Sequence, residues 1–524
     1  FCDYVQEYLA RAGLSKDQIA KGGYLIKTTL DPDVQGSVKS AVDSLAPPDI
    51  NGIASVMSVI LPGKTAHPVV AMVSNRTYGL DTAAGEAVQP QPFSLVGDGA
   101  GSIFKIFTTA AAMDMGLGIG ANLDAPVRFE AKGLGSGGAR GCPSNTWCVQ
   151  NAGNYRGSMS VTDALAQSPN TAFAKLISQV GVQRTVDMAV KLGLRSYAEP
   201  GTARPYDPET NESLADYIKR YNLGSFTLGP IEVNALELSN VAATLASGGM
   251  WCPPNPIDKV YDRLGNEVAV TTETCDQVVP EGLANTLSNA LSKDDTNGTA
   301  ANSAGSVGWG LPMSGKTGTT EAHRSSGFLG YTNRYAAASY IYDDSPNPTD
   351  LCSWPLRQCG DGNLYGGNEP AKTWFSAMKP IAESFGGVEQ NAVGFLAGRT
   401  AGTPDLKRRP RRQGGQNLLP HHVKMVRFAQ ETGEVCRQRI NQRSQFEAGP
   451  VRLDVVQILC DVPQSEVTDP FAQPCADQCF LARLEVQAED AVSQCLDLTE
   501  LLRLHYRSRH RPGRKFRRWH GRPQ

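Results

Sequence analysis

Residues 102–105 read Ser-Ile-Phe-Lys, and this short Ser-x-x-Lys stretch decides how the rest of the chain is interpreted. A helical pattern runs around 103–115, and residues three apart on a helix share one face, so Lys105 can reach back to the Ser102 hydroxyl. A serine hydroxyl becomes a good nucleophile only when a neighbouring base takes its proton. A lysine desolvated beside other cations can act as that base. Ser102 and Lys105 are therefore candidates for a nucleophile and its base.

Two further motifs follow along the chain, Ser168-Pro169-Asn170 and Lys316-Thr317-Gly318-Thr319. Second copies of the first two motifs occur at 376–379 (Ser-Ala-Met-Lys) and at 345–347 (Ser-Pro-Asn). Only one choice of copies gives the order Ser-x-x-Lys, Ser-x-Asn, Lys-Thr-Gly along the chain. That ordered set is far more specific than any of its parts.

The third motif suits a strand that binds a substrate. Alternating residues around it predict a strand, on which Lys316 supplies a second cation. Gly318 lets a substrate backbone lie flat against this strand because it carries no side chain. The hydroxyls of Thr317 and Thr319 can bind a carboxylate, and a free strand N–H can face a developing oxyanion.

Each motif also has an ordinary structural interpretation. Taken alone, residues 102–105 are typical of an exposed polar pair at a helix end, 168–170 of a turn, and 316–318 of a strand edge. His323 follows the third motif closely, but it has no paired acid in view and is expected at the surface. The joint occurrence of the three motifs in order favours the catalytic interpretation.

The overall composition conceals a break in the chain. The 524 residues carry 50 Lys+Arg and 52 Asp+Glu, a balance that argues against a nucleic-acid-binding protein. Residues 391–524, however, hold 22 Lys+Arg and 14 Asp+Glu, whereas residues 1–390 hold 28 and 38. The basic residues also change from 13 Arg and 15 Lys before the break to 19 Arg and 3 Lys after it. Two unlike sequences are therefore joined here. The chain contains no apolar run of about 18 residues, so no membrane span is predicted.

The pattern of hydrophobic residues predicts helices embedded between β-hairpins. The runs at 54–61 and 68–74 predict one hairpin, and those at 326–332 and 335–342 predict a second. This arrangement favours an α+β fold over a parallel doubly wound sheet. The other expected elements are a helix at 3–20, a strand at 24–30, and helices at 31–33 onward, 160–167, 171–180, 182–192 and 230–247.

The cysteines indicate an oxidising compartment. Cys142 and Cys148 bracket one loop, and Cys352 and Cys359 bracket another, so each pair can close a small ring. We expect these two local disulfides and a third bridge between Cys252 and Cys275, with Cys2 left over. Buried free thiols are the alternative. No pair of Cys-x-x-Cys motifs occurs, so a structural zinc site is not predicted.

The ordered motifs resemble those of the penicillin-binding transpeptidases, serine acyltransferases that share this set. Residues 21–35 are similar to the junction that precedes the transpeptidase domain in bifunctional class A penicillin-binding proteins, and 228–249 resemble the helix after the middle motif. Further similarities lie at Asn297-Gly298-Thr299-Ala300, at 327–331 and at Pro370 with Trp374-Phe375. The resemblance covers roughly residues 1–386. It implies an antiparallel β-sheet flanked by helices on both faces, as in the β-lactamase-like fold, followed by an irregular C-terminal tail.

The resemblance also implies a role for each motif residue. Ser102 would attack the penultimate D-Ala carbonyl of a stem peptide, and the N–H groups of Ser102 and Thr319 would form the oxyanion hole. Ser168 would relay a proton to the leaving D-Ala. The implied catalytic residues are Ser102 (nucleophile), Lys105 (base), Ser168 (proton relay), Asn170 (orients the substrate amide and Lys105) and Lys316 (charge network); the implied substrate-binding residues are Thr317, Gly318 and Thr319.

The implied function is D,D-transpeptidation, which cross-links peptidoglycan stem peptides through an acyl-enzyme and is inhibited covalently by β-lactams. Its partners are a D-Ala-D-Ala donor and a diamino-acid acceptor on the extracytoplasmic face of a bacterial membrane. No metal, organic cofactor or nucleic acid is implied. The alternatives are a D,D-carboxypeptidase or β-lactamase, in which water is the acceptor, and a penicillin-sensing receptor domain that does not turn over.

We expect three parts along the chain. Residues 1–45 are a junction from an upstream domain, 46–386 a transpeptidase domain, and 387–524 an Arg-rich tail without catalytic function. Because the chain begins at Phe1, we expect it to lack an upstream glycosyltransferase domain and the N-terminal segment that would attach it to the membrane. Residues 323–326 (His-Arg-Ser-Ser) depart from the acidic-aromatic sequence common in the family at this point.

The tail admits three interpretations. It is a disordered, solvated segment, a binder of anionic polymer or membrane through the arginines at 507–522, or the product of a reading-frame error in a GC-rich gene. The abrupt change from Lys to Arg, together with the loss of the resemblance, favours the last of these.

Overall fold

The structure is a computed structural model that describes residues 1–50, 52–321, 323–351 and 364–384, and three strands between 423 and 460. The chain divides into two units, Phe1–Pro410 and Arg411–Gln524. In the second unit the backbone forms a three-stranded antiparallel sheet of β18 (Val423–Ala429), β19 (Val435–Asn441) and β20 (Ile458–Cys460). The rest of the predicted irregular tail lies outside the described residues.

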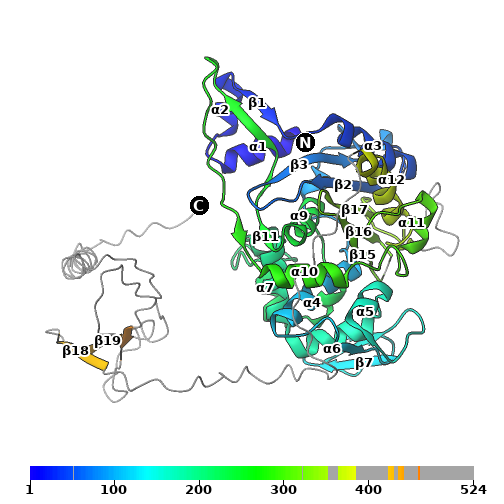
Figure 1. The fold of residues 1–524 in the computed structure, drawn as a ribbon, viewed down its shortest axis with the longest axis vertical. Helices are drawn as coiled ribbons and strands as arrows, with labels where there is room; N and C mark the ends of the chain where they lie inside the picture. Colours follow the sequence, from blue (N-terminus) through cyan, green and yellow to red (C-terminus); the bar gives the residue numbers. More distant parts are fainter. Residues whose placement is uncertain are drawn as a thin grey trace, which may run out of the picture. The chain divides into compact units, whose positions relative to one another are not determined.

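A six-stranded sheet forms the centre of the first unit (Figure 1). Its strands pair antiparallel except at one edge, where the short β12 runs parallel to β3. The expected hairpins are confirmed as β2–β3 and β16–β17. The strand order is β12 (Pro254–Asn255), β3 (His67–Ser74), β2 (Ala54–Ile60), β17 (Ala336–Tyr342), β16 (Ser325–Tyr331) and β15 (Ser314–Thr319).

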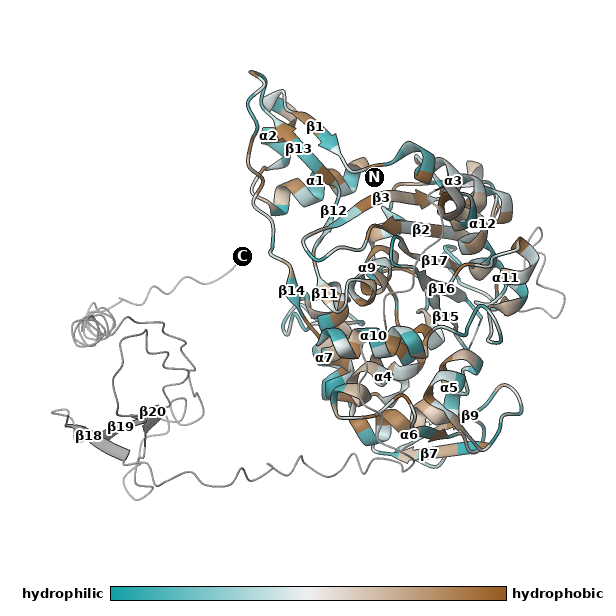
Figure 2. Cartoon of the chain, in the orientation of Figure 1, coloured by the Kyte–Doolittle hydropathy of each residue, from teal (hydrophilic) through white to brown (hydrophobic). Residues whose placement is uncertain are grey.

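Hydrophobic side chains cover both faces of this sheet, because successive residues of a strand point to opposite sides. In β2, Val56 and Ile60 belong to one buried cluster, and Met57 and Val59 belong to another. Helices α4 (Lys105–Asp114) and α9 (Ala235–Ala246) pack in the first cluster, and α3 (Pro32–Leu45) and α12 (Glu369–Ser384) pack in the second. Figure 2 shows the apolar residues gathered on the sheet and on the helices beside it. The α+β fold with helices on both faces is thus confirmed.

The remaining elements surround this framework. The other helices are α5 (Val161–Gln167), α6 (Asn170–Val180), α7 (Val182–Leu192), α8 (Leu214–Arg220), α10 (Glu281–Ala290) and α11 (Ala301–Val307). The 3-10 helices are η1 (Thr82–Ala84), η2 (Gln91–Phe93), η3 (Gly101–Phe104), η4 (Arg195–Ala198) and η5 (Gly224–Leu228). The short strands are β4 (Thr77–Tyr78), β5 (Glu86–Ala87), β6 (Asn122–Asp124), β7 (Arg128–Lys132), β8 (Gly137–Gly138), β9 (Thr146–Gln150), β10 (Ser158–Ser160), β11 (Met250–Trp251) and β14 (Asp276–Gln277).

The N-terminal segment differs from the expected single helix at 3–20. Two helices form instead, α1 (Cys2–Arg11) and α2 (Lys16–Gly22), because Gly13 adopts a φ of 95° and Ser15 begins a new helix. The Ser15 hydroxyl accepts from the Gln18 N–H (3.2 Å), and the Gln18 side chain accepts from the Ser15 N–H (2.8 Å), which is a capping box. The Ser-x-x-Gln pattern at 15–18 indicates this break in the sequence, so the prediction of one continuous helix was wrong.

The junction residues pack onto the rest of the first unit. Strand β1 (Leu25–Thr28) pairs antiparallel with β13 (Ile257–Tyr261), more than 200 residues later in the chain. Asp31 caps α3 by accepting from the N–H groups of Asp33 and Val34. The Ser37 hydroxyl of α3 then donates to the Ala377 carbonyl of α12 (2.8 Å). The division of the chain at residue 45 stays a prediction, since α3 contributes to the same core as the sheet.

Two of the predicted disulfides form, Cys142–Cys148 and Cys252–Cys275. Cys2 is a free, exposed thiol. The predicted Cys352–Cys359 pair lies outside the described residues.

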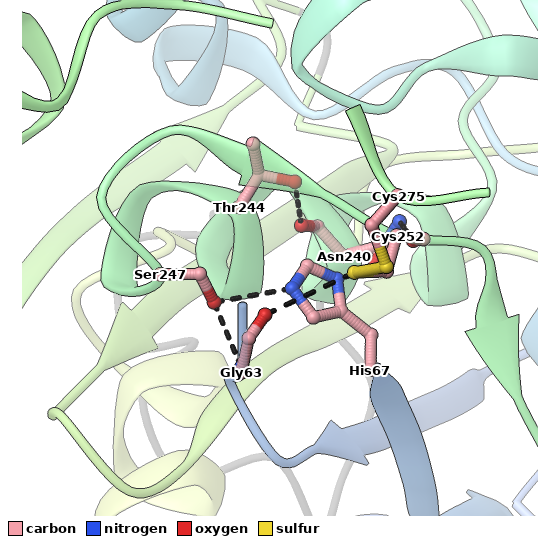
Figure 3. Close-up of a disulfide and its surroundings, with 7 residues drawn as sticks. All are labelled: Gly63, His67, Asn240, Thr244, Ser247, Cys252 and Cys275. Carbon is pink, nitrogen blue, oxygen red and sulfur yellow. Dashed lines mark hydrogen bonds between the residues drawn. A yellow bond between two sulfur atoms is a disulfide. The ribbon is translucent and has the colours of Figure 1, made fainter. Parts of the chain in front are cut away.

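A buried histidine lies next to the second of these bridges (Figure 3). The Nδ1 atom of His67 donates to Asn240 Oδ1 (2.7 Å), and its Nε2 atom accepts from the Ser247 hydroxyl (3.1 Å). Asn240 also donates to the Cys252 carbonyl (3.0 Å), so the network connects β3, α9 and the disulfide. Burial lowers the pKa of His67, and the neutral ring satisfies both partners.

Candidate active site

The Ser102 side chain lies where η3 passes into α4. In a 3-10 helix the residues i and i+3 overlie one another, so the turn that carries Ser102 places Lys105 on the same side. Ser102 is partly exposed, whereas Lys105 is fully buried. Among the described residues, none makes a hydrogen bond to the Ser102 hydroxyl. The turn therefore presents a partly exposed hydroxyl and, three residues later, a buried amine.

The loop before Ser102 is attached to the sheet through the Gly99 carbonyl. This oxygen accepts from the Ser325 hydroxyl (2.6 Å) and from the Tyr340 hydroxyl (3.1 Å). Gly99 itself has a φ of 107°, and a Cβ atom there would lie 2.0 Å from the Gly229 carbonyl oxygen. Only glycine fits this close approach. The loop that carries Ser102 is therefore held by β16 and β17.

The structure brings Lys105 into direct contact with the middle motif. Its Nζ atom lies 2.7 Å from the Ser168 carbonyl oxygen, 2.8 Å from Asn170 Oδ1 and 3.0 Å from the Ser168 hydroxyl oxygen. Two of these atoms are carbonyl oxygens, which take the two hydrogens of a neutral amine. The lone pair of such an amine then remains available to a hydroxyl group.

The turn at 168–170 presents these oxygens because of its backbone conformation. Ser168 ends α5 in the left-handed region, with a φ of 63°, and Asn170 begins α6. The next residue, Thr171, is held by Asn151: the Asn151 side chain accepts from the Thr171 N–H (3.0 Å) and donates to its hydroxyl (2.9 Å). The sequence prediction of a turn between two helices is confirmed, and the turn faces Lys105.

Strand β15 carries the third motif at the edge of the sheet. Lys316 is fully buried. Gly318 approaches the loop at residues 99–102 so closely that a Cβ atom on it would lie 1.8 Å from the Ala100 carbonyl oxygen. Side chains at 316 and 318 share one face of the strand. Lys316 and the loop at residues 99–102 therefore lie on the same side of the sheet edge.

Two buried lysines so close together explain the charge state of the site. Burial lowers the pKa of Lys105 well below its usual range, and the positive charge of Lys316 lowers it further. Burial also lowers the pKa of Lys316, but the Asp294 carboxylate acts in the opposite direction. Lys105 is therefore the more readily deprotonated amine of the two.

Among the described residues, the backbone N–H of Thr319 has no hydrogen-bond partner, and it lies beside the loop that carries Ser102. The N–H of Thr320 pairs inward with Ser325, and that of Thr317 points outward to Asp294, so alternation along the strand turns the Thr319 N–H outward. A Cβ atom on Gly101 would lie 2.4 Å from this nitrogen. The amides of Ser102 and Thr319 thus border the same space, as an oxyanion hole requires.

The two threonine hydroxyls of the motif have different partners. Thr319 Oγ1 accepts from the Gly366 N–H (2.9 Å), which leaves its own proton free to donate. Thr317 Oγ1 contacts Thr299 Oγ1, and since Thr299 donates to Asp294 (2.7 Å), the Thr317 hydroxyl is the donor in that contact. Of the two hydroxyls, that of Thr319 is therefore the one whose proton has no acceptor among the described residues.

The second copies of the motifs lie elsewhere. Ser376 and Lys379 belong to α12, on the opposite face of the sheet from α4, and Lys379 donates to the Val307 carbonyl. Ser345 follows β17 and makes none of the Lys105 contacts. His323 also stays outside the lysine cluster, where its ring packs against Tyr365 at 5.1 Å between ring centroids. Of the motif copies in the described part of the chain, only the ordered set is brought together: Lys105 contacts Ser168 and Asn170, and the loop at 99–102 packs against Gly318 and Thr319.

Several residues of the site had no signal in the sequence analysis. Asp294 and Gly366 contact the third motif from segments 22 and 48 residues away from Lys316 or Gly318 in the chain. Thr299 appeared only as part of a resemblance, without a role.

Comparisons with known proteins agree with this geometry. Residues 59–348, more than half of the chain, match the family described as the penicillin-binding protein transpeptidase domain. This chain belongs to that family. The Mycobacterium tuberculosis penicillin-binding protein 1A is 24% identical over 385 residues, 71% of this chain and 42% of the relative. The Clostridium perfringens penicillin-binding protein 1A is 25% identical over 374 residues, 66% of this chain and 49% of the relative. The chain thus spans less than half the length of these relatives.

Solved structures show the same fold. A structure of the PonA1 protein from Mycobacterium tuberculosis in complex with penicillin V has a TM-score of 0.58 and 20% identity, covering 75% of this chain and 97% of that one. The penicillin-binding protein 1A from Haemophilus influenzae has a TM-score of 0.57 and 16% identity, covering 75% and 71%. The penicillin-binding transpeptidase assignment from the motifs is confirmed. No helix in the described part of the chain is long and apolar enough to cross a membrane.

Proposed function

We propose that this chain is a D,D-transpeptidase that cross-links peptidoglycan stem peptides through a serine acyl-enzyme. The observation that supports this most strongly is the buried Lys105 amine held between the Ser168 and Asn170 carbonyl oxygens, at the base of the Ser102 turn. Family membership supports an acyltransferase of the penicillin-binding class. The β-lactam complex of a structural relative supports the same chemistry.

The first half-reaction forms the acyl-enzyme. The Ser102 hydroxyl passes its proton to the neutral Lys105 amine while its oxygen bonds to the penultimate D-Ala carbonyl carbon. The Ser102 and Thr319 amides receive the oxyanion. The C–N bond to the terminal D-Ala then breaks, and the proton reaches the leaving amine through the Ser168 hydroxyl, which lies 3.0 Å from Lys105 Nζ.

The second half-reaction transfers the acyl group. The amine of a neighbouring stem peptide attacks the ester, gives a proton back through Lys105, and the ester bond to Ser102 breaks as its oxygen is reprotonated. Lys316 supplies positive charge near the reacting groups, and the half-buried Asn170 amide orients the substrate chain. A β-lactam follows the first half-reaction alone, because its opened ring stays attached.

Recognition of the donor carboxylate falls to the threonine hydroxyls. Thr319 donates to the carboxylate without rearrangement because Gly366 already occupies its acceptor side. The Thr317 hydroxyl, which donates to Thr299 in this structure, contributes by donating to the carboxylate instead. Gly318, without a side chain, lets the donor backbone lie along β15.

The full protein is proposed to act on the outer face of the bacterial membrane, attached through an N-terminal segment. An upstream peptidoglycan glycosyltransferase domain is part of the same proposal, and the greater length of the curated relatives supports it. The division into a junction at 1–45, a transpeptidase domain at 46–386 and a non-catalytic tail at 387–524 also remains a proposal.

The test is product analysis with a stem-peptide donor and a diamino-acid acceptor. Transpeptidation predicts a cross-linked dimer with release of one D-Ala per bond formed. Release of D-Ala without dimer supports a D,D-carboxypeptidase instead. A stable penicilloyl adduct with neither product supports a penicillin-sensing receptor domain.

A further inference from the structure

A buried carboxylate lies at the edge of the active site without a place in the reaction steps above. Asp294 belongs to the segment after α10 that runs along the outer edge of β15. In this segment the Leu291 carbonyl accepts from the Gly315 N–H (3.0 Å), and Asp294 Oδ2 accepts from the Thr317 N–H (2.8 Å). The segment thus covers the strand edge as far as Thr317 and leaves Thr319 open.

The second carboxylate oxygen of Asp294 binds donors from its own loop. Oδ1 accepts from the Thr299 N–H (2.8 Å), the Thr299 hydroxyl (2.7 Å) and, at 3.3 Å, the Ala300 N–H. Among the described residues, all hydrogen-bond partners of the two oxygens are donors, which favours an ionised carboxylate. Burial raises the pKa of Asp294, and these hydrogen bonds together with the positive charge of Lys316 oppose that rise. A side chain with 2% exposure is thereby fully supplied with hydrogen bonds.

The same segment also binds the helix that carries the middle motif. The Thr299 N–H lies 3.1 Å from the Ala166 carbonyl oxygen, two residues before Ser168. Lys293 forms an ion pair with Asp163, at the start of the same helix (3.2 Å). We refer to residues 293–300 as the clamp segment, because it contacts α5 and β15 at once.

We propose that Asp294 is a positioning residue for acyl transfer, which holds the Lys-Thr-Gly strand in register with the Ser168 turn and places a negative charge opposite Lys316. This inference rests on the proposed function, since it concerns the rate of acylation of Ser102. Asp294 touches neither substrate nor the reacting atoms. It acts through the Thr317 backbone and through its charge.

The charges around Asp294 make its effect measurable. Lys316 precedes Thr317 on β15, whose N–H Asp294 binds (2.8 Å). Asp295 adjoins Asp294 on the clamp segment, and Lys293 is paired with Asp163 of α5. Lys105, on α4, senses Asp294 only through Lys316. Because the Asp294 charge raises the pKa of Lys316, its removal lets Lys316 lose its proton at lower pH. The alkaline limb of the acylation profile then moves to lower pH.

The test compares Asp294→Asn with Asp295→Asn by the rate of acylation with a fluorescent penicillin across pH. Asp294→Asn is expected to slow acylation by about 10- to 100-fold, the factor of a lost hydrogen bond to a charged group, and to shift the alkaline limb downward. Asp295→Asn removes the neighbouring carboxylate, whose pKa burial raises to about 6, and is expected to leave both unchanged.

The control outcomes separate the two proposals. If the wild-type chain is not acylated, the proposed function fails; if it is acylated and Asp294→Asn matches it, only the role of Asp294 fails. A uniform loss of rate with an unmoved alkaline limb also overturns the charge role. Should Asp294→Asn not fold, Thr299→Val and Thr299→Ser are compared instead. Thr299→Val loses the hydroxyl and is expected to slow acylation about threefold. Thr299→Ser keeps the hydroxyl and is expected to acylate at the wild-type rate. Equal acylation rates for the two variants overturn the proposal.

Discussion

The Nζ atom of Lys105 lies 2.8 Å from Oδ1 of Asn170, across 65 residues of sequence. This contact places a buried amine against a neutral carbonyl rather than against a carboxylate. A neutral partner accepts a hydrogen bond without favouring the protonated amine as strongly as an anion would. An amide at position 170 therefore favours the neutral Lys105 amine, which the proposed role of Lys105 as the base requires.

Replacing Asn170 by aspartate tests that interpretation. A carboxylate 2.8 Å from Lys105 raises the pKa of the amine and so keeps it protonated at neutral pH. Acylation of Asn170→Asp by a fluorescent penicillin is expected to fall by about 100-fold at neutral pH and to recover as the pH rises. Asn170→Ala serves as the control, since it weakens acylation without moving the acid limb upward. An unchanged acid limb in Asn170→Asp contradicts the assignment of Lys105 as the base.

The two disulfides are expected to differ in their contribution to stability. Cys252–Cys275 closes a separation of 23 residues and Cys142–Cys148 one of 6. Chain entropy predicts losses in the free energy of unfolding of about 3.5 and about 2.4 kcal/mol when each is removed. Denaturant unfolding of the two Cys→Ser double variants measures this difference. A larger loss for the Cys142–Cys148 pair would show that native contacts, not loop closure, dominate.

His67 predicts a pH dependence of stability with a definite sign. Burial lowers its pKa below the ordinary value of 6.5, so the unfolded state binds more protons between these two values. The free energy of unfolding is therefore expected to decrease as the pH falls below about 6.5, and His67→Gln should flatten that decrease. His323→Gln, outside the buried core, is the matched control. The same slope in the wild type and in His67→Gln would refute the assignment.

The sequence predicted those parts of the site whose residues lie within a few positions of one another in the chain. Ser102 and Lys105 were predicted together because three-residue spacing fixes a shared face. The turn at 168–170 was predicted from its Pro and Asn. Asp294 and Gly366 were not, because their roles arise only when β15 lies between them. No local pattern records that meeting.

The fold shows the same division. The hairpins β2–β3 and β16–β17 were predicted from period-2 patterns and turn residues, and the structure pairs both. β17 then pairs with β2, which lies far away in the sequence. No single stretch of sequence predicts this pairing, because it depends on the burial of both faces of the sheet. The helix predicted at 3–20 was wrong because Ser15 and Gln18 form a local capping box that overrides the apolar spacing.

Deletion of residues 387–524 is expected to leave acylation unchanged. Among the described residues, the hydrogen bonds of Lys105 Nζ go to Ser168 and Asn170, and those of the Thr317 N–H and the Thr319 hydroxyl go to Asp294 and Gly366. Equal second-order rates of penicillin acylation for the full and shortened chains agree with a non-catalytic tail. A loss of acylation in a shortened chain that still unfolds cooperatively contradicts it.

The central claim is that Ser102, and not the second Ser-x-x-Lys serine at 376, is the nucleophile. Labelling with a fluorescent penicillin, followed by denaturing electrophoresis, tests it on Ser102→Ala and Ser376→Ala side by side. Ser376 belongs to α12 on the other face of the sheet, so its variant should label like the wild type. Ser102→Ala should not label at all. Persistent labelling of Ser102→Ala, or its loss in a folded Ser376→Ala, would contradict the account.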